Sequence, residues 1–147
     1  TLIMHTEPTD NEGPNLFKVT ELLGIQNNVF FSRDRLEFEK INGLNLIQGN
    51  VIKFKNDENP LSTNVGWMKI SPKINHEIFK NVNFDVEFYF DHSYYFKPSL
   101  GENILSVSKI NSNFCSSVIN KNIFGFQFHI EKSHKNGLKI LENFCNL

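Results

Sequence analysis

The start of the chain shows two patterns of apolar and polar positions: short apolar runs and a helical spacing of apolar residues. Short apolar runs at residues 2–4 and 29–31 predict two strands. Between them, apolar residues that share one face predict a helix over residues 15–23, with Asn15 suited to cap it and Gly24 to end it. This strand–helix–strand opening is typical of a parallel sheet.

From residue 43 onward, turns separate short segments that we interpret as strands. The expected strands are 66–70, 85–90, 104–110 and 114–119, preceded by a segment, 46–54, that contains a turn at residues 48–50. Such closely spaced strands predict an antiparallel region in the middle of an α/β domain.

The C-terminal part returns to a buried strand followed by a helix. Residues 124–128 are almost wholly apolar, as in a central strand that is covered on both faces. A helix is expected to begin near Ser133, which is suited to cap it, and to end near Cys145. Leu138, Leu141 and Cys145 are expected to share its apolar face.

Composition narrows the class of protein. A net charge of -1 over 147 residues gives no electrostatic footprint for nucleic acid or an anionic membrane. No apolar run reaches the length of a membrane span, and no signal peptide is visible. The 15 phenylalanines favour strands and a buried aromatic core. We therefore expect one cytoplasmic α/β domain over residues 1–147.

The chain has two cysteines, Cys115 and Cys145, which are too few for a disulfide scaffold. Two reduced, partly buried thiols in a cytosolic protein are expected instead. A zinc site built from His92, His129 and a cysteine lacks any paired ligand spacing, so no metal is expected.

The most informative polar residues follow the last predicted strand. His129 and Glu131 are two apart, so in an extended segment their side chains point the same way and can hydrogen-bond. Glu131 would then fix the tautomer of His129, as a general base for a cysteine nucleophile requires. Spacing alone leaves open a surface histidine and a glutamate that favours a helix N-terminus.

The whole segment 124–133 resembles the Q-F-H-P-E-x-S signature of class I, triad-type glutamine amidotransferases. Ile130 stands where that family usually has proline. Further segments, in family order, are similar to the glutaminase subunit of imidazole glycerol phosphate synthase: 15–19 with 23–24, 43–51, 64–68 and 88–95. Several motifs in the same order are far more specific than one.

The resemblance implies a flavodoxin-like fold, with a mostly parallel sheet flanked by helices and an added antiparallel region. It implies hydrolysis of glutamine to glutamate and ammonia by a Cys-His-Glu triad, with His129 and Glu131 as catalytic residues and Ser93 and Tyr94 as contacts to glutamine. It further implies a heterodimer with a TIM-barrel synthase (cyclase) subunit in histidine biosynthesis, and no cofactor.

One part of the family pattern is missing. The family places its G-x-C-x-G-x-Q nucleophile elbow after the second strand, an interval that residues 33–42 bridge here without a cysteine. Cys115 falls where the family has an ordinary strand, so an internal deletion and an inactive chain are expected. The alternatives are a non-catalytic remnant that binds a partner, a paralogue serving surface-sugar amination, and an unrelated small α/β binding domain.

Overall fold

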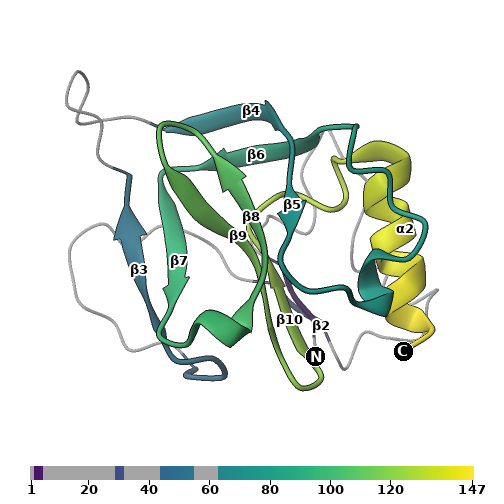
Figure 1. Ribbon diagram of the computed structural model, residues 1–147, viewed down its shortest axis with the longest axis horizontal. Helices are drawn as coiled ribbons and strands as arrows, with labels where there is room; N and C mark the ends of the chain where they lie inside the picture. Colours follow the sequence, from purple (N-terminus) through teal and green to yellow (C-terminus); the bar gives the residue numbers. More distant parts are fainter. Residues whose placement is uncertain (1, 5–28, 32–43, 55–62) are drawn as a thin grey trace.

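The computed structural model describes residues 2–4, 29–31, 44–54 and 63–147 (Figure 1). Within these residues the strands are β1 (Leu2–Met4), β2 (Val29–Phe31), β3 (Gly49–Lys53), β4 (Asn64–Met68), β5 (Ser71–Pro72), β6 (Phe88–His92), β7 (Tyr94–Pro98), β8 (Ile104–Lys109), β9 (Asn113–Asn120) and β10 (Ile123–Phe126). The helical elements are the 3-10 turns η2 (Glu77–Phe79) and η3 (Gly101–Asn103) and the α-helix α2 (His134–Cys145).

Six of these strands form one mixed sheet in the order β2-β1-β10-β9-β8-β5. β1 lies between β2 and β10 and pairs with both in parallel, which confirms the parallel opening. The pairings β10–β9, β9–β8 and β8–β5 are antiparallel. The α/β class is confirmed, but in the described part of the chain the expected parallel arrangement is limited to one side of the sheet. The helix expected at 15–23 lies outside the described residues.

Two antiparallel ribbons, β3–β7 and β4–β6, make up the expected antiparallel region (Figure 1). The turn expected at residues 48–50 is wrong, because Gly49 is the first residue of β3. A Cβ at Gly49 would overlap the ring of Phe96 and the carbonyl oxygen of Lys97 on β7. The glycine therefore serves a close approach of two strands and not a turn.

Two other strands are shifted from their expected positions. β6 begins at Phe88 and not at residue 85, because the Asp85 amide bonds the Asn83 side chain in a local turn. β10 ends at Phe126, although the Gln127 amide still donates to the Ser116 carbonyl at 2.9 Å. The chain therefore leaves the sheet two residues earlier than the apolar run suggests.

The core is rich in phenylalanine, as the composition predicts. The rings of Phe88, Phe90 and Phe126 each lie within 5.7 Å of the Phe128 ring. Phe88 and Phe90, on β6, are fully buried. The segment that follows β10 is therefore held against β6 by a group of aromatic contacts directly before His129.

Helix α2 covers this core with a face that differs from the expected one. Gly137, Ile140 and Leu141 are buried, whereas Leu138 is 62% exposed and Cys145 is exposed. The expectation for Leu138 and Cys145 is wrong because Gly137 lies against the Ile130 backbone, where a Cβ would overlap the carbonyl oxygen. This close approach sets the rotation of the helix about its axis.

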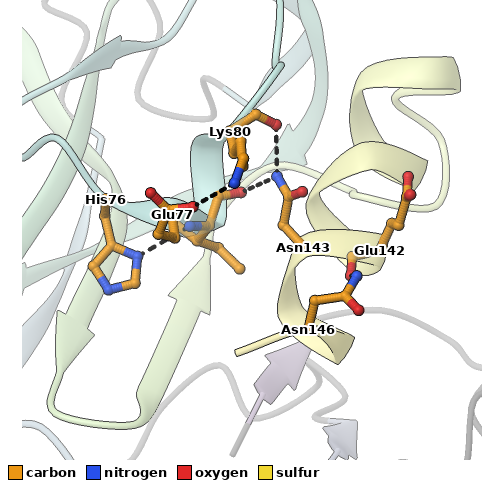
Figure 2. Close-up of polar contacts among 7 residues, drawn as sticks. His76, Glu77, Lys80, Glu142, Asn143 and Asn146 are labelled. Atoms are coloured by element: carbon orange, nitrogen blue, oxygen red, sulfur yellow. Dashed lines mark hydrogen bonds and ion pairs between the residues drawn. The ribbon is translucent and has the colours of Figure 1, made fainter.

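Polar contacts hold the C-terminal half of α2 against η2 (Figure 2). The Asn143 side-chain amide donates to the carbonyl oxygens of Ile78, at 2.9 Å, and Lys80, at 2.8 Å. Both carbonyls lie where η2 ends, so one side chain satisfies two backbone acceptors. No helix in the described ranges is long and apolar enough to cross a membrane.

Candidate active site

The segment that leaves β10 brings His129 and Glu131 together. Nδ1 of His129 lies 2.8 Å from Oε1 of Glu131, and the two side chains are 10% and 4% exposed. The expected contact between these residues is confirmed. A carboxylate oxygen only accepts, so Nδ1 donates this hydrogen bond, and in the neutral ring Nε2 then keeps the lone pair that a base needs.

The backbone of His129 is anchored to β6. Its amide donates to the Tyr89 carbonyl at 2.8 Å, and its ring lies 5.9 Å from the Tyr89 ring. Tyr89 sits between two fully buried phenylalanines, so the anchor belongs to a strand that is fixed in the core. His129 is therefore held by main-chain and side-chain contacts at once.

Ile130, the residue that departs from the proline of the family pattern, does not disturb this contact. It is 1% exposed, and its carbonyl accepts from the Ser133 amide at 3.2 Å in the turn that leads into α2. The apolar side chain fills a core position. The His129–Glu131 hydrogen bond forms with isoleucine in place.

Ser93 and Tyr94 lie at the corner between β6 and β7. The Ser93 hydroxyl is 3.1 Å from the Thr63 hydroxyl, and the Ser93 carbonyl accepts from the Phe54 amide. The Tyr94 ring is half-buried, with Nζ of Lys53 5.8 Å from its centre. This corner follows the end of β6, whereas His129 is bonded to Tyr89 nearer its start.

His92, beside that corner, is a core histidine. Its Nδ1 donates to the Tyr94 carbonyl at 2.8 Å, and its Nε2 accepts from the side-chain amide nitrogen of Asn64 at 2.9 Å. Phe54 and Phe114 pack around the ring, which is 5% exposed. Both ring nitrogens are thus engaged in fixing the strand ends. Within the described ranges, no three His, Cys, Asp or Glu residues are grouped as a metal site requires.

Trp67 lies on the surface and extends the ring contacts of the site. It is 42% exposed, stacks on His134 at 4.9 Å with an interplanar angle of 11°, and meets Tyr89 edge-on at 5.5 Å. Ring contacts therefore link the exposed Trp67 to Tyr89 and Tyr89 to His129. Trp67 is therefore not a fully buried core residue.

Residues 44–147 match the family model described as Glutamine amidotransferase class-I. The chain belongs to this family. The matched part of the chain contains His129, Glu131, Ser93 and Tyr94, and it begins after the interval, residues 33–42, that lacks the family's elbow. That interval lies outside the described residues.

Three relatives of this amidotransferase chain are named as HisH subunits of imidazole glycerol phosphate synthase. The imidazole glycerol phosphate synthase subunit HisH 2 of Pseudomonas aeruginosa is 37% identical over 105 residues, 71% of this chain and 52% of the relative. Subunit HisH 2 of Methanococcus maripaludis is 36% identical over 125 residues, 85% and 62%. Subunit HisH of Neisseria meningitidis serogroup B is 40% identical over 119 residues, 77% and 56%. The chain thus spans between 52% and 62% of the length of these three curated relatives.

A solved structure supports the amidotransferase fold. A putative GMP synthase protein from Thermoplasma acidophilum aligns with a TM-score of 0.53 at 20% identity, over 67% of this chain and 47% of that chain. At this identity the likeness concerns the fold alone.

Neither cysteine of this amidotransferase is placed as a nucleophile. Cys115 lies on β9, where its thiol donates to the Ser117 carbonyl at 3.3 Å, and burial raises its pKa from 9.0 to about 12. Cys145 is exposed near the end of α2, and partial burial raises its pKa. Both thiols are free, as expected, although Cys145 is more exposed than the sequence suggested.

Sequence reasoning missed three partners of these site residues and assigned another role to Ser133. Thr63 and Asn64 bond Ser93 and His92 across the β4–β6 ribbon, and Tyr89 supports His129. Ser133 was expected to cap α2, but its side chain makes no capping bond. Only cross-strand register, which the sequence does not specify, would have identified the first three.

Proposed function

We propose that this chain is a glutaminase-type subunit of the imidazole glycerol phosphate synthase lineage. The supporting observation is the largely buried His129–Glu131 pair, hydrogen-bonded at 2.8 Å just after a central strand of a class-I amidotransferase. In the proposed chemistry, a cysteine thiol attacks the side-chain amide of glutamine, which forms a thioester and releases ammonia. Water then hydrolyses the thioester, which releases glutamate and restores the thiol.

Each proposed site residue has a distinct task. Glu131 accepts a hydrogen bond from Nδ1, which keeps Nε2 of His129 available to take the proton of a thiol and pass it to the leaving ammonia. Ser93 and Tyr94 contact the bound glutamine from the β6–β7 corner. No cofactor takes part in this scheme, since the thiol, the base, the amide and a water molecule supply all the reacting groups.

We propose that the chain of 147 residues is inactive as a glutaminase. A nucleophile needs a base and oxyanion donors close by, and residues 33–42 supply no cysteine. Cys115 cannot substitute, because it is buried on β9 with a pKa of about 12. We propose residues 1–147 as one amidotransferase-like domain with an internal deletion around 33–42.

The proposed partner is a TIM-barrel synthase subunit, with which the chain forms a cytoplasmic heterodimer that passes ammonia onward. The relatives are named as subunits of a synthase, which supports a partner of this kind. A second candidate function, a partner-binding remnant without catalysis, is favoured by exposed apolar side chains on β4, with Val65 at 58% and Trp67 at 42% exposure.

Ammonia release from glutamine tests the proposed inactivity. We expect the purified chain and its His129→Ala variant to release ammonia at the same rate as buffer. Release by the unaltered chain that His129→Ala abolishes would contradict inactivity and support catalysis by His129. If Cys115→Ser also abolished it, the structural role of Cys115 would be wrong as well.

The encoding DNA separates the two candidate functions. An intervening sequence, frameshift or assembly gap between the codons for Asp34 and Gly43 would restore an intact elbow and the active enzyme. A clean in-frame join favours the non-catalytic remnant.

A further inference from the structure

Ser133 is buried in an unusual way for a residue directly before a helix. It is 1% exposed, and although it occupies the N-cap position of α2, its side chain makes no capping hydrogen bond. Serine at this position ordinarily uses its hydroxyl for an amide of the first helical turn. The hydroxyl of Ser133 is instead directed to the other side, toward β6.

There it closes a small ring of hydrogen bonds around His129. The Ser133 hydroxyl donates to the His129 carbonyl at 2.6 Å and accepts from the Tyr89 amide at 3.1 Å. The His129 amide donates to the Tyr89 carbonyl at 2.8 Å. Both backbone groups of His129 and both of Tyr89 are therefore satisfied, two of them by one hydroxyl.

The ring bridges an interval that a strand ladder does not cover. β10 ends at Phe126, so His129 lies beyond the regular hydrogen bonds of the sheet. Without the hydroxyl, the Tyr89 amide would lose its partner in this segment, and the His129 carbonyl would keep only the Lys132 amide, which donates to it at 3.2 Å. The peptide after His129 would then be held less firmly, and any rotation of that peptide changes where Glu131 lies relative to the His129 ring.

We propose that Ser133 is a positioning residue for the His129–Glu131 pair, acting through the backbone of His129 and not as a helix cap. The proposal rests on the role of His129 as the base, but the geometry that it explains exists without a nucleophile. Backbone support from Gly137 completes it, because its amide donates to the Ser133 carbonyl at 3.0 Å.

The test follows two NMR signals of His129 in the chain as it exists. Amide hydrogen exchange reports the bond to Tyr89, and the ring ¹⁵N shifts report which nitrogen carries the proton. In Ser133→Ala we expect His129 amide exchange to accelerate at least tenfold and the ring shifts to move toward a mixture of tautomers. Ser133→Thr, which keeps a hydroxyl, should return both signals toward those of the unaltered chain.

Ser106→Ala is the matched control, because Ser106 is fully buried, hydrogen-bonds Ser116 at 2.8 Å, and lies on β8 and not beside His129. It should alter neither signal beyond its effect on global exchange. Equal effects in Ser133→Ala and Ser106→Ala would overturn the proposal. If Ser133→Ala does not fold, altered ring shifts in a folded Ser133→Thr would overturn it.

These outcomes are independent of the proposed function, since neither signal requires glutamine, a cysteine or a synthase. Ammonia release and partner binding can fail while the His129 ring responds to Ser133, and the reverse also holds.

Discussion

At the scale of single residues, burial separates the two thiols. Cys115 has a pKa of about 12, so at pH 8 only about one molecule in ten thousand carries a thiolate there. Cys145 is exposed on α2. We expect a thiol reagent such as Ellman's to modify Cys145 readily and Cys115 roughly 1,000-fold more slowly than an ordinary thiol. Between pH 7 and 9 the Cys115 rate should rise about tenfold per pH unit, because the thiol pKa lies well above this range.

The Cys145→Ser variant leaves Cys115 as the thiol that reacts. Unfolding this variant in urea should expose Cys115 and make its modification fast. Fast modification of Cys115 in the folded Cys145→Ser chain would show that β9 is accessible and that the assignment of Cys115 as a structural residue is wrong.

Sequence alone predicted the contact of His129 with Glu131 because residues two apart in extended chain share a side. It did not predict what Ser133 does. The same residue type before a helix is suited to cap it, and only the approach of β6 decides which amide the hydroxyl serves. Local rules therefore identified the hydrogen-bonded His129–Glu131 pair and missed the groups that hold it.

At the scale of elements, the packing of α2 depends on Gly137. Replacing an interior helical glycine by alanine ordinarily stabilises a helix by about 1 kcal/mol. Here the added Cβ would overlap the Ile130 carbonyl oxygen, a backbone atom that cannot rotate away. We expect Gly137→Ala to lower the free energy of unfolding by about 3 kcal/mol, measured by urea denaturation.

Leu138→Ala is its control, since Leu138 is the next residue of α2 and is 62% exposed. A change within about 0.5 kcal/mol is expected there. A Gly137→Ala chain as stable as the original would mean that α2 and Ile130 are further apart than described.

The hairpin between β9 and β10 carries a strained residue. Its register pairs Asn120 with Ile123, which leaves a two-residue turn in which Lys121 has a φ of 55°. Glycine adopts positive φ without a Cβ penalty. We expect Lys121→Gly to raise the free energy of unfolding by about 0.5–1 kcal/mol.

Lys121→Ala separates backbone strain from loss of the lysine side chain, because alanine keeps the Cβ. It should leave the stability nearly unchanged in the same urea experiment. An equal gain in both variants would place the effect in the side chain and not in φ.

Strand existence was easier to predict than strand limits. The pair 104–110 and 114–119 appears as β8 and β9 with small shifts, because two short strand-forming segments separated by a polar turn are local signals. The limits of β6 and the face of α2 were set by an asparagine turn and by a close backbone approach. Neither contact is visible in hydrophobic periodicity.

At the scale of the whole molecule, Trp67 offers a direct test of partner binding. It is the single tryptophan of the chain, so labelling with 5-fluorotryptophan gives one ¹⁹F resonance. We expect titration with the TIM-barrel synthase subunit to shift this resonance saturably, because an interface over β4 would cover Trp67. Val86→Ala, at another exposed apolar side chain (47%), should bind normally.

An unshifted resonance, together with separate elution of the two proteins at micromolar concentration, would remove partner binding from the proposed function. Val65 lies two residues before Trp67 on β4 and is also exposed. If the Val65→Asp variant gave the same saturable shift as the unaltered chain, the interface would lie away from β4.

Ordered motifs predicted the family at this scale, since several short matches together are specific where each alone is weak. They did not predict that β1 would pair with β10. Pairing between distant segments follows from which strands are available to the whole sheet, and the resemblance describes a sheet with strands that residues 33–42 do not supply.

The parallel pairing of Leu2 with Phe124 joins the first strand of this chain to the last one. On a ribosome, β1 and its neighbour β2 emerge long before β10, the other neighbour of β1, exists. In contrast, β8, β9 and β10 appear in succession and can form their hairpins at once. The slow event in maturation is then pairing of β1 with the completed β8–β9–β10 sheet. A nascent chain stalled before residue 123 would leave one edge of β1 open to chaperones, or to other chains.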